Sequence, residues 1–330
     1  MGAGSQGRCA AIIGTGLIGQ GWAIVFARKG WSVRLYDVNA AMLAEARSLI
    51  LQQLRELETQ GLLEDADGII GRVHVADSLA DAVKGACYIQ ENSPEKVEIK
   101  RALFSELDAV AEPDAVIGSS TSSIPASQFT EHLPGRHRCL VAHPVNPPYL
   151  IPVVELCPAP WTSPQALDAA REAMTAVGQK PVLVRREIEG FILNRLQGAL
   201  LHEAFRLAKD GIASAEDIDV TVKDGLGLRW SFMGPFETID LNAPGGIADY
   251  CARYGGLYQS IGADQGECVA WDGALVGALE DERRGLLPQE DLAKRRFWRD
   301  EKLMRLMRHK QENGDNLSLI HISEPTRRYA

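Results

Sequence analysis

Apolar and polar positions along the first half of the chain follow a pattern that predicts strands alternating with helices. An apolar run at 9–13 leads into a helical apolar pattern that closes at Gly30, and an alternating run follows at 33–36. Beyond these, the pattern predicts helices at 40–60, 79–84, 94–107 and 163–177, and strands at 73–76, 87–91, 115–119, 138–143, 151–157 and 182–184. Strands that alternate with helices indicate an α/β fold, a Rossmann-type doubly wound sheet that is mostly parallel.

Two segments of this half carry more specific expectations. Residues 62–70 are rich in acidic side chains and are expected to form a connection between the helix at 40–60 and the strand at 73–76. The strand at 151–157 follows the strand at 138–143 so closely that the two are expected to pair antiparallel, because a parallel pair needs a long crossover.

The pattern changes after Arg186. Residues 189–209 form a long amphipathic helical pattern, and Ser214 is expected to cap the helix that follows. Strand patterns are missing from there on, so we predict a Rossmann-type domain at residues 1–188 and an all-α domain at 189–316. Residues 317–327, LSLIHISEPTR, resemble the translation of a sequencing-library adapter, and we interpret residues 317–330 as a tail derived from one.

Composition narrows the class of protein. The chain has 330 residues, 45% of them hydrophobic, and a net charge of −9, with no basic stripe for nucleic acid and no long apolar run for a membrane. No signal peptide is expected at the N-terminus. The six cysteines are dispersed, and Cys9, Cys87 and Cys139 sit in apolar runs. We expect buried reduced thiols in a cytoplasmic protein without a metal site.

A glycine-rich turn joins the first strand to the first helix, and its sequence is Gly14-Thr15-Gly16-Leu17-Ile18-Gly19. Gly14 permits the tight turn, Gly16 lets the backbone approach a pyrophosphate, and Gly19 lets the helix pack on the sheet. Such a turn alone is a weak signal. Here the next strand ends on Asp37, whose carboxylate can bind a ribose diol and would repel a 2′-phosphate, so the sequence predicts NAD rather than NADP.

Three further features could carry chemistry. His143 ends a strand, and Glu155 lies in the next one, so an antiparallel pair would place an imidazole beside a carboxylate. A lone histidine at a strand end is more often structural, and Glu155 could equally form a salt bridge there. The run of serine and threonine at 119–123 follows a parallel strand at the edge where ligands bind, although it could be a plain polar turn. Asn194, a poor helix former, lies near the start of the long helix and could instead be a surface amide.

Taken together, these motifs resemble the 3-hydroxyacyl-CoA dehydrogenase family. The likeness covers about residues 8–310 and rests on segments in the family's order and spacing: GTGLIG, SSTSS, AHPVNPP, VEL and GFILNR. It implies an NAD-dependent enzyme with His143 as catalytic base and Glu155 as its partner. Ser122 and Asn194 would bond the substrate hydroxyl and position His143. It also implies an NAD site that includes Gly14, Gly16, Leu17, Ile18, Gly19, Asp37, Glu95, Lys100 and Asn146.

Within that implied site, Asp37 would hold the adenosine ribose. Glu95 and Lys100 would contact the nicotinamide side, and Asn146 would lie near the same ring. Glu91 is the alternative to Glu95 if the register differs by one turn.

The family contains sugar-acid, carnitine and acyl-CoA enzymes. With the segment LGLRWSFMGP, the motifs are nearest to the branch whose substrate is L-gulonate, although LRWSFM also resembles the carnitine enzymes. Residues 41–70 contain two basic and six acidic side chains, a local charge of −4 that disfavours the phosphates of CoA. A small hydroxy acid needs a cation for its carboxylate, and Arg229 or Arg195 could provide it, although Arg229 could equally form an interdomain or dimer salt bridge. For carnitine, Trp230, Phe232 and Tyr250 could form an aromatic cage. A non-catalytic, crystallin-like protein that binds NADH is the alternative outside enzymes, and a homodimer through the helical domain is expected.

Overall fold

The computed structural model describes residues 7–266 and 272–313 of the chain. The tail that we interpret as adapter-derived, 317–330, and Cys268 lie outside these residues. The chain separates into two compact units. The first runs to Arg195 and also takes in Asp300–His309, whereas the second begins at Leu196 and runs to Arg299.

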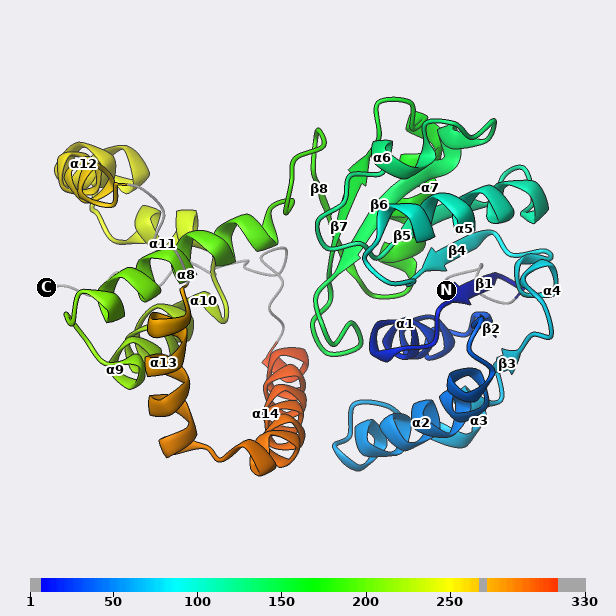
Figure 1. Ribbon diagram of the computed structural model, residues 1–330, viewed down its shortest axis with the longest axis horizontal. Helices are drawn as coiled ribbons and strands as arrows, with labels where there is room; N and C mark the ends of the chain where they lie inside the picture. The colour runs from blue at the N-terminus through cyan, green and yellow to red at the C-terminus, as the bar shows by residue number, and fades with distance from the viewer. Residues whose placement is uncertain (1–6, 267–271, 314–330) are drawn as a thin grey trace, which may run out of the picture. The chain divides into compact units, whose positions relative to one another are not determined.

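The first unit is built on one eight-stranded sheet with the order β3-β2-β1-β4-β5-β6-β7-β8 (Figure 1). Its strands are β1 (Cys9–Ile13), β2 (Ser32–Tyr36), β3 (Val73–Val75), β4 (Tyr88–Glu91), β5 (Val116–Ser119), β6 (Cys139–Pro144), β7 (Val153–Pro158) and β8 (Lys180–Leu183). Every neighbouring pair is parallel except β6 and β7, which are antiparallel. The predicted doubly wound, mostly parallel sheet and its antiparallel pair are confirmed.

Helices cover both faces of this sheet, as a parallel sheet requires. They are α1 (Leu17–Ala27), α2 (Ala40–Thr59), α3 (Ala66–Ile70), α4 (Leu79–Val83), α5 (Val97–Val110), α6 (Ser127–Thr130) and α7 (Pro164–Ala176), with a 3₁₀ turn at Arg136–Arg138. All five residues of β1 are buried, and Ile12 belongs to one core cluster while Ile13 belongs to the other. Successive side chains of a strand point to opposite faces, so β1 contributes to both cores.

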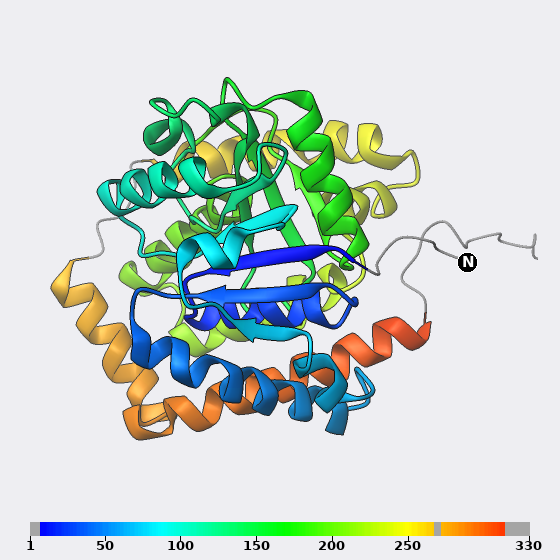
Figure 2. The ribbon, with the colours of Figure 1, turned by 90° about the vertical axis from the view of Figure 1, so that its right-hand side faces the viewer.

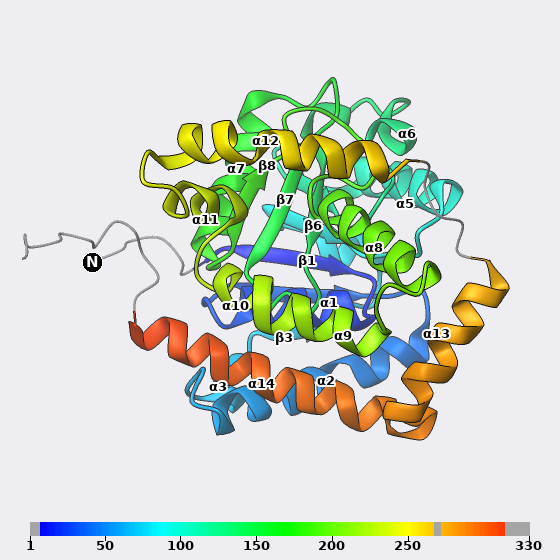
Figure 3. The ribbon, with the colours of Figure 1, turned by 90° about the vertical axis from the view of Figure 1, so that its left-hand side faces the viewer.

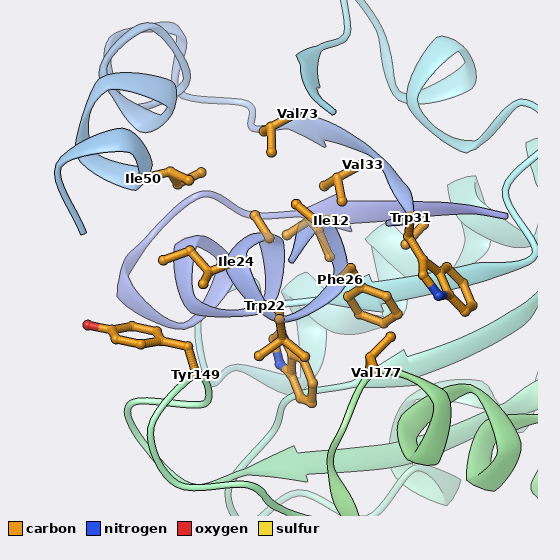
Figure 4. Close-up of a cluster of buried hydrophobic side chains, with 14 of the residues drawn as sticks. Ile12, Trp22, Ile24, Phe26, Trp31, Val33, Ile50, Val73, Tyr149 and Val177 are labelled. Atoms are coloured by element: carbon orange, nitrogen blue, oxygen red, sulfur yellow. The ribbon is translucent and has the colours of Figure 1, made fainter. Parts of the chain in front are cut away.

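The core on the α1 face is rich in aromatic side chains (Figure 4). Trp22 and Phe26 of α1 are fully buried, and the Phe26 ring lies 5.1 Å from the Trp31 ring between their centroids. Ile12 and Val33 meet this cluster from the sheet. These contacts fix α1 against β1, and therefore fix the glycine turn that joins them.

A segment from the C-terminal end of the described chain completes the first unit. Asp300–His309 belongs to α14 (Leu292–Asn313) and lies beside α2 (Figures 2 and 3). Met304 is buried in the α1-face core, and Arg308 Nη1 donates to the Gln60 carbonyl at 3.4 Å. Long-range packing of this kind leaves no local signal in the sequence.

The second unit is helical. Besides most of α8 (Leu193–Lys209) and parts of α14, it contains α9 (Ala215–Val220), a π-helical turn (Thr221–Leu226), α10 (Gly227–Trp230), α11 (Pro235–Leu241), α12 (Gly246–Asp264), α13 (Gly273–Leu286) and a 3₁₀ turn (Gln289–Asp291). Ser214 caps α9 by accepting a hydrogen bond from the Asp217 N–H at 3.1 Å, as predicted. Among the described helices, none is long and apolar enough to cross a membrane.

Three expectations about local structure are wrong, and a fourth is incomplete. The connection at 62–70 contains α3, because Asp65 accepts the Gly68 N–H and caps a helical turn. The helix expected from Pro94 begins at Val97, since Lys96 is extended. The long helix begins at Leu193 rather than at 189, because Gly190 and Phe191 both have positive φ. Cys87 is exposed rather than buried, since it lies directly before the first residue of β4.

Candidate active site

The glycine turn is shaped by contacts that only glycine allows. Gly14 has φ +91°, and a Cβ there would lie 2.7 Å from the Asn92 carbonyl oxygen. A Cβ on Gly19 would lie 1.9 Å from the Gly14 carbonyl oxygen, so the first turn of α1 packs directly on the loop. At Gly16, by contrast, the nearest atom would be Met42 Cε at 3.9 Å. Gly16 therefore borders open space at the N-terminus of α1, where a phosphate could approach the free N–H groups.

Asp37 follows β2 and is tied to the same turn. Its Oδ2 accepts the Thr15 N–H at 2.7 Å and the Thr15 hydroxyl at 3.1 Å, and its Oδ1 accepts the Asn39 N–H at 2.8 Å. The carboxylate is thus held at the carboxyl end of the sheet, close to the glycine turn. A dinucleotide needs an anion-binding turn and an acid for the ribose, and both are present in the expected places.

His143 and Glu155 form a buried pair on the antiparallel strands β6 and β7. They are direct partners in the register, and His143 Nδ1 lies 2.8 Å from Glu155 Oε2. Their exposed fractions are 6% and 2%. Because Nδ1 faces the carboxylate, it carries the proton, and Nε2 is the ring nitrogen left to accept one.

Glu155 has a second function that the sequence did not reveal. Its Oε1 accepts the N–H groups of Ile192 at 2.8 Å and Leu193 at 2.9 Å, so the carboxylate also caps the start of α8. Burial raises the pKa of Glu155, but the hydrogen bonds from His143 and from these two N–H groups outweigh it and lower the pKa below its ordinary value. The group is therefore a carboxylate at neutral pH.

The five hydroxyl side chains at 119–123 are engaged unequally. Ser119 donates to Glu91, and Ser120 donates to Asn92 Oδ1 at 2.7 Å while accepting from Trp22 Nε1 and Gln90 Nε2. Thr121 is buried and donates to Glu95 Oε1 at 2.6 Å. Ser122 is the exposed member, and its hydroxyl has only a long 3.4 Å contact with Glu95 Oε1. Of the run, Ser122 is the hydroxyl most available to a substrate.

Asn194 is the second residue of α8, and its Nδ2 donates to the Ser122 carbonyl oxygen at 2.7 Å. This bond joins the start of α8 to the turn at 119–123, called the serine turn below, while Glu155 joins the start of α8 to β7. His143, Glu155, Ser122 and Asn194, separated widely in the sequence, are therefore linked through a few hydrogen bonds within the first unit.

Lys100 and the two candidate glutamates lie together. Lys100 Nζ lies 3.0 Å from Glu91 Oε2 and 4.0 Å from Glu95 Oε2, and Lys100 and Glu91 are both almost fully buried. Lys100 thus faces its carboxylate partners inside the unit. Asn146 is exposed after β6, directly before a cis peptide bond to Pro147.

The two arginines considered for the substrate carboxylate lie in different units. Arg195 is exposed beside Asn194 at the end of the first unit, and Arg229 is exposed on α10 in the second.

Among the described residues, no group of three His, Cys, Asp or Glu side chains could hold a metal ion.

Two family models match the chain along most of its length. Residues 9–188 match the NAD binding domain of 3-hydroxyacyl-CoA dehydrogenase, and residues 190–265 match the C-terminal domain of that enzyme. The chain belongs to the 3-hydroxyacyl-CoA dehydrogenase family. It is an NAD-dependent dehydrogenase that acts on 3-hydroxyl groups, and the glycine turn with Asp37 is suited to its NAD.

Several members of this family are similar to the chain. Lambda-crystallin of Oryctolagus cuniculus is 40% identical over 306 residues, which cover 91% of this chain and 96% of that protein. L-carnitine dehydrogenase of Pseudomonas putida is 39% identical over 246 residues, or 74% of this chain and 76% of that protein. A solved structure of an NAD⁺-dependent 5-formyl-3-hydroxy-2-methylpyridine 4-carboxylic acid 5-dehydrogenase superimposes with a TM-score of 0.78 at 29% identity, covering 93% of this chain and 99% of that one.

Sequence reasoning missed a buried polar network beneath the site of this family member. Gln90 Nε2 donates to Ser120 Oγ at 2.7 Å and to the Ala142 carbonyl at 3.1 Å, directly before His143. Asn92 Nδ2 donates to the Ile13 carbonyl at 3.1 Å, directly before the glycine turn. The network therefore connects the backbone on either side of the site. The available signal was Gln90, a polar side chain inside a buried strand, followed by Asn92 directly after that strand.

Replacing two glycines of the turn separately should distinguish cofactor binding from folding. Gly16→Ala is expected to leave thermal stability near that of the wild type, because its Cβ meets no atom closer than 3.9 Å, but to weaken NADH binding. Gly19→Ala is expected to lower stability by roughly 1–3 kcal/mol, because its Cβ would overlap the Gly14 carbonyl. Thermal melts and NADH fluorescence titrations measure both effects. Normal NADH affinity in Gly16→Ala would contradict the assignment of this turn.

Proposed function

We propose that this dehydrogenase oxidises the 3-hydroxyl of a small hydroxy acid, with L-gulonate as the favoured substrate and 3-dehydro-L-gulonate as the product. The observation that carries the proposal is the shortage of available cations where CoA phosphates would need them. Arg55 pairs with Asp67 at 3.2 Å on the surface, and Arg47 Nε donates to the Val73 carbonyl at 3.3 Å, so each of the two bases of residues 41–70 already has a partner within the chain. The local charge of −4 would repel a polyphosphate.

In the proposed reaction His143 is the general base. Bound NAD supplies the acceptor for the hydride that leaves C3. His143 takes the proton of the 3-hydroxyl at Nε2, while Glu155 holds the ring through Nδ1 and stabilises the imidazolium. Ser122 offers its hydroxyl to the substrate oxygen, and Asn194 fixes Ser122 through its carbonyl. Support comes from the 2.8 Å bond between His143 and Glu155 and the 2.7 Å bond between Asn194 and Ser122.

The substrate carboxylate requires a positive partner, and we propose Arg229 or Arg195 for it. A guanidinium can bind a carboxylate with two parallel hydrogen bonds. Arg229→Ala and Arg195→Ala, compared with each other, should separate the candidates, because the true partner raises KM for the acid by roughly tenfold or more while the other does not. Unchanged KM in both variants would exclude them.

L-carnitine is the second candidate substrate. The observation in its favour is the similarity to a carnitine enzyme, together with exposed Trp230 and Phe232 next to Arg229 and a half-exposed Tyr250. An aromatic cage of these side chains could attract a trimethylammonium group.

A panel of four substrates tests these proposals. L-gulonate, L-carnitine, 3-hydroxybutyrate and 3-hydroxybutyryl-CoA are each supplied with NAD, and NADH formation is followed by absorbance. The proposal predicts the highest kcat/KM for L-gulonate, at least about tenfold above the CoA ester. A preference for carnitine would favour the aromatic cage, and a preference for the CoA ester would overturn the charge argument. NADH binding without turnover of any member would favour a crystallin-like, non-catalytic role.

We also propose that the protein is a cytoplasmic homodimer that pairs through its helical unit. Support comes from large apolar side chains left exposed there, including Phe236, Leu241, Leu257 and Tyr258. Light scattering should give twice the 36.0 kDa chain mass, and a value for one chain would refute the dimer.

A further inference from the structure

Glu95 lies at a bend shortly before α5, and one of its carboxylate oxygens binds several groups of the serine turn. Oε1 accepts hydrogen bonds from two backbone N–H groups, those of Ser122 and Ser123, each at 3.0 Å. It is also within 2.6–3.4 Å of the hydroxyls of Thr121, Ser122 and Ser123. A single carboxylate thus holds three consecutive residues.

Ser122 is held at both ends of its backbone. Glu95 accepts its N–H at 3.0 Å, and Asn194 Nδ2 donates to its carbonyl at 2.7 Å. The side chain between these two anchors is exposed. Such bracketing fixes the Cα–Cβ direction, and with it the region that the Ser122 hydroxyl can reach.

Glu95 is itself supported from inside the unit. Lys100 Nζ lies 4.0 Å from Glu95 Oε2, and its position is set by the buried Glu91, which also accepts from the hydroxyls of Ser119 and Ser93. Partial burial raises the pKa of Glu95, but the Thr121 hydroxyl, the Lys100 charge and the Ser123 hydrogen bonds outweigh it and lower the pKa below its ordinary value. The carboxylate is therefore charged when it holds the turn.

We propose that Glu95 is a positioning residue for hydride transfer, which clamps the serine turn so that the Ser122 hydroxyl meets the reacting oxygen of the substrate. The inference rests on the substrate-bonding role proposed for Ser122. It differs from a contact between Glu95 and the nicotinamide side of NAD, because a clamp acts through Ser122, whereas a cofactor contact acts independently of Ser122. A displacement of a positioned group by about 1 Å can cost about 10²-fold in rate.

A double-mutant cycle separates the two roles. Glu95→Ala is expected to lower kcat/KM by roughly 10–100-fold while NADH affinity stays within about twofold of the wild type. In the Ser122→Ala background, adding Glu95→Ala should lower kcat/KM by less than about a further twofold, because the hydroxyl that Glu95 positions is already missing. The proposed clamp would be refuted if the two single losses in kcat/KM multiplied in the double variant, or if Glu95→Ala lowered NADH affinity in parallel with kcat/KM.

Glu95→Asp provides the control for charge and for folding. It keeps the negative charge near Lys100 but withdraws the oxygens by one methylene, so we expect a loss comparable to that of Glu95→Ala, again absent in the Ser122→Ala background. Wild-type activity in Glu95→Asp would overturn the proposal. If Ser122→Ala alone leaves kcat/KM unchanged, the function proposed for Ser122 is refuted, and the clamp is refuted with it. If Ser122→Ala lowers kcat/KM and the losses of the two variants multiply, only the clamp is refuted.

Discussion

His143→Ala is expected to lower kcat by roughly 10²–10⁴-fold and to leave NADH affinity nearly unchanged. The imidazole is the group that would take the hydroxyl proton. It is bonded to Glu155 at 2.8 Å and lies beside the Phe191 ring, with 5.6 Å between the ring centroids. Steady-state kinetics with the preferred acid gives kcat, and NADH fluorescence gives the dissociation constant.

A matched control uses another histidine of the same sheet. His74 lies exposed on the edge strand β3, away from β6 and β7, so His74→Ala should retain wild-type kcat. Loss of both turnover and NADH binding in His143→Ala would indicate a folding defect and would remove the support for a catalytic base. Retained turnover in that variant would exclude His143 from the chemistry.

Glu155→Gln is expected to have the second large effect, because one carboxylate serves three donors. If the amide oxygen keeps the N–H groups of Ile192 and Leu193, the amide NH₂ must face His143 Nδ1. Nδ1 would then become an acceptor, the proton would move to Nε2, and the ring could no longer act as a base. Loss of the correct tautomer costs up to about 10⁴-fold in kcat in an analogous catalytic triad.

The same variant should also change the pH dependence of stability. The pKa of Glu155 is lower in the folded chain than its ordinary value of 4.5, so its ionised form stabilises the fold above that pH. This contribution declines as the pH falls through the folded-state pKa. Urea unfolding should therefore show wild type more stable than Glu155→Gln at pH 7, by roughly 1–3 kcal/mol, with a smaller difference below about pH 4. A difference that is constant across this range would show that the charge of Glu155 does not contribute.

Much of the fold follows from local pattern. The buried run of β1, the glycine turn and the alternation of strands with helices predict the sheet. The short connection between β6 and β7 predicts their antiparallel pairing, which places His143 opposite Glu155. These features are set by residues that lie close together in the sequence, so local patterns are enough to predict them.

The rest depends on contacts between distant segments. Glu95 falls within the helix predicted at 94–107 but lies before the observed α5, where its carboxylate binds a turn 26–28 residues later. Positive φ at Gly190 and Phe191 delays the start of α8 until the N–H groups that follow can reach Glu155. Met304 packs into a core formed largely by the first half of the chain. Periodicity in one segment carries no information about such partners.

In the proposed reaction, a hydride leaves C3 of a small hydroxy acid for NAD. Turnover of L-gulonate deuterated at C3 tests this hydride transfer most directly, and mass spectrometry then gives the mass of the NADH that is formed. We predict that the NADH carries the deuterium and that the 3-oxo product carries none at that carbon. Unlabelled NADH, or no NADH at all, would contradict the proposed substrate and reaction.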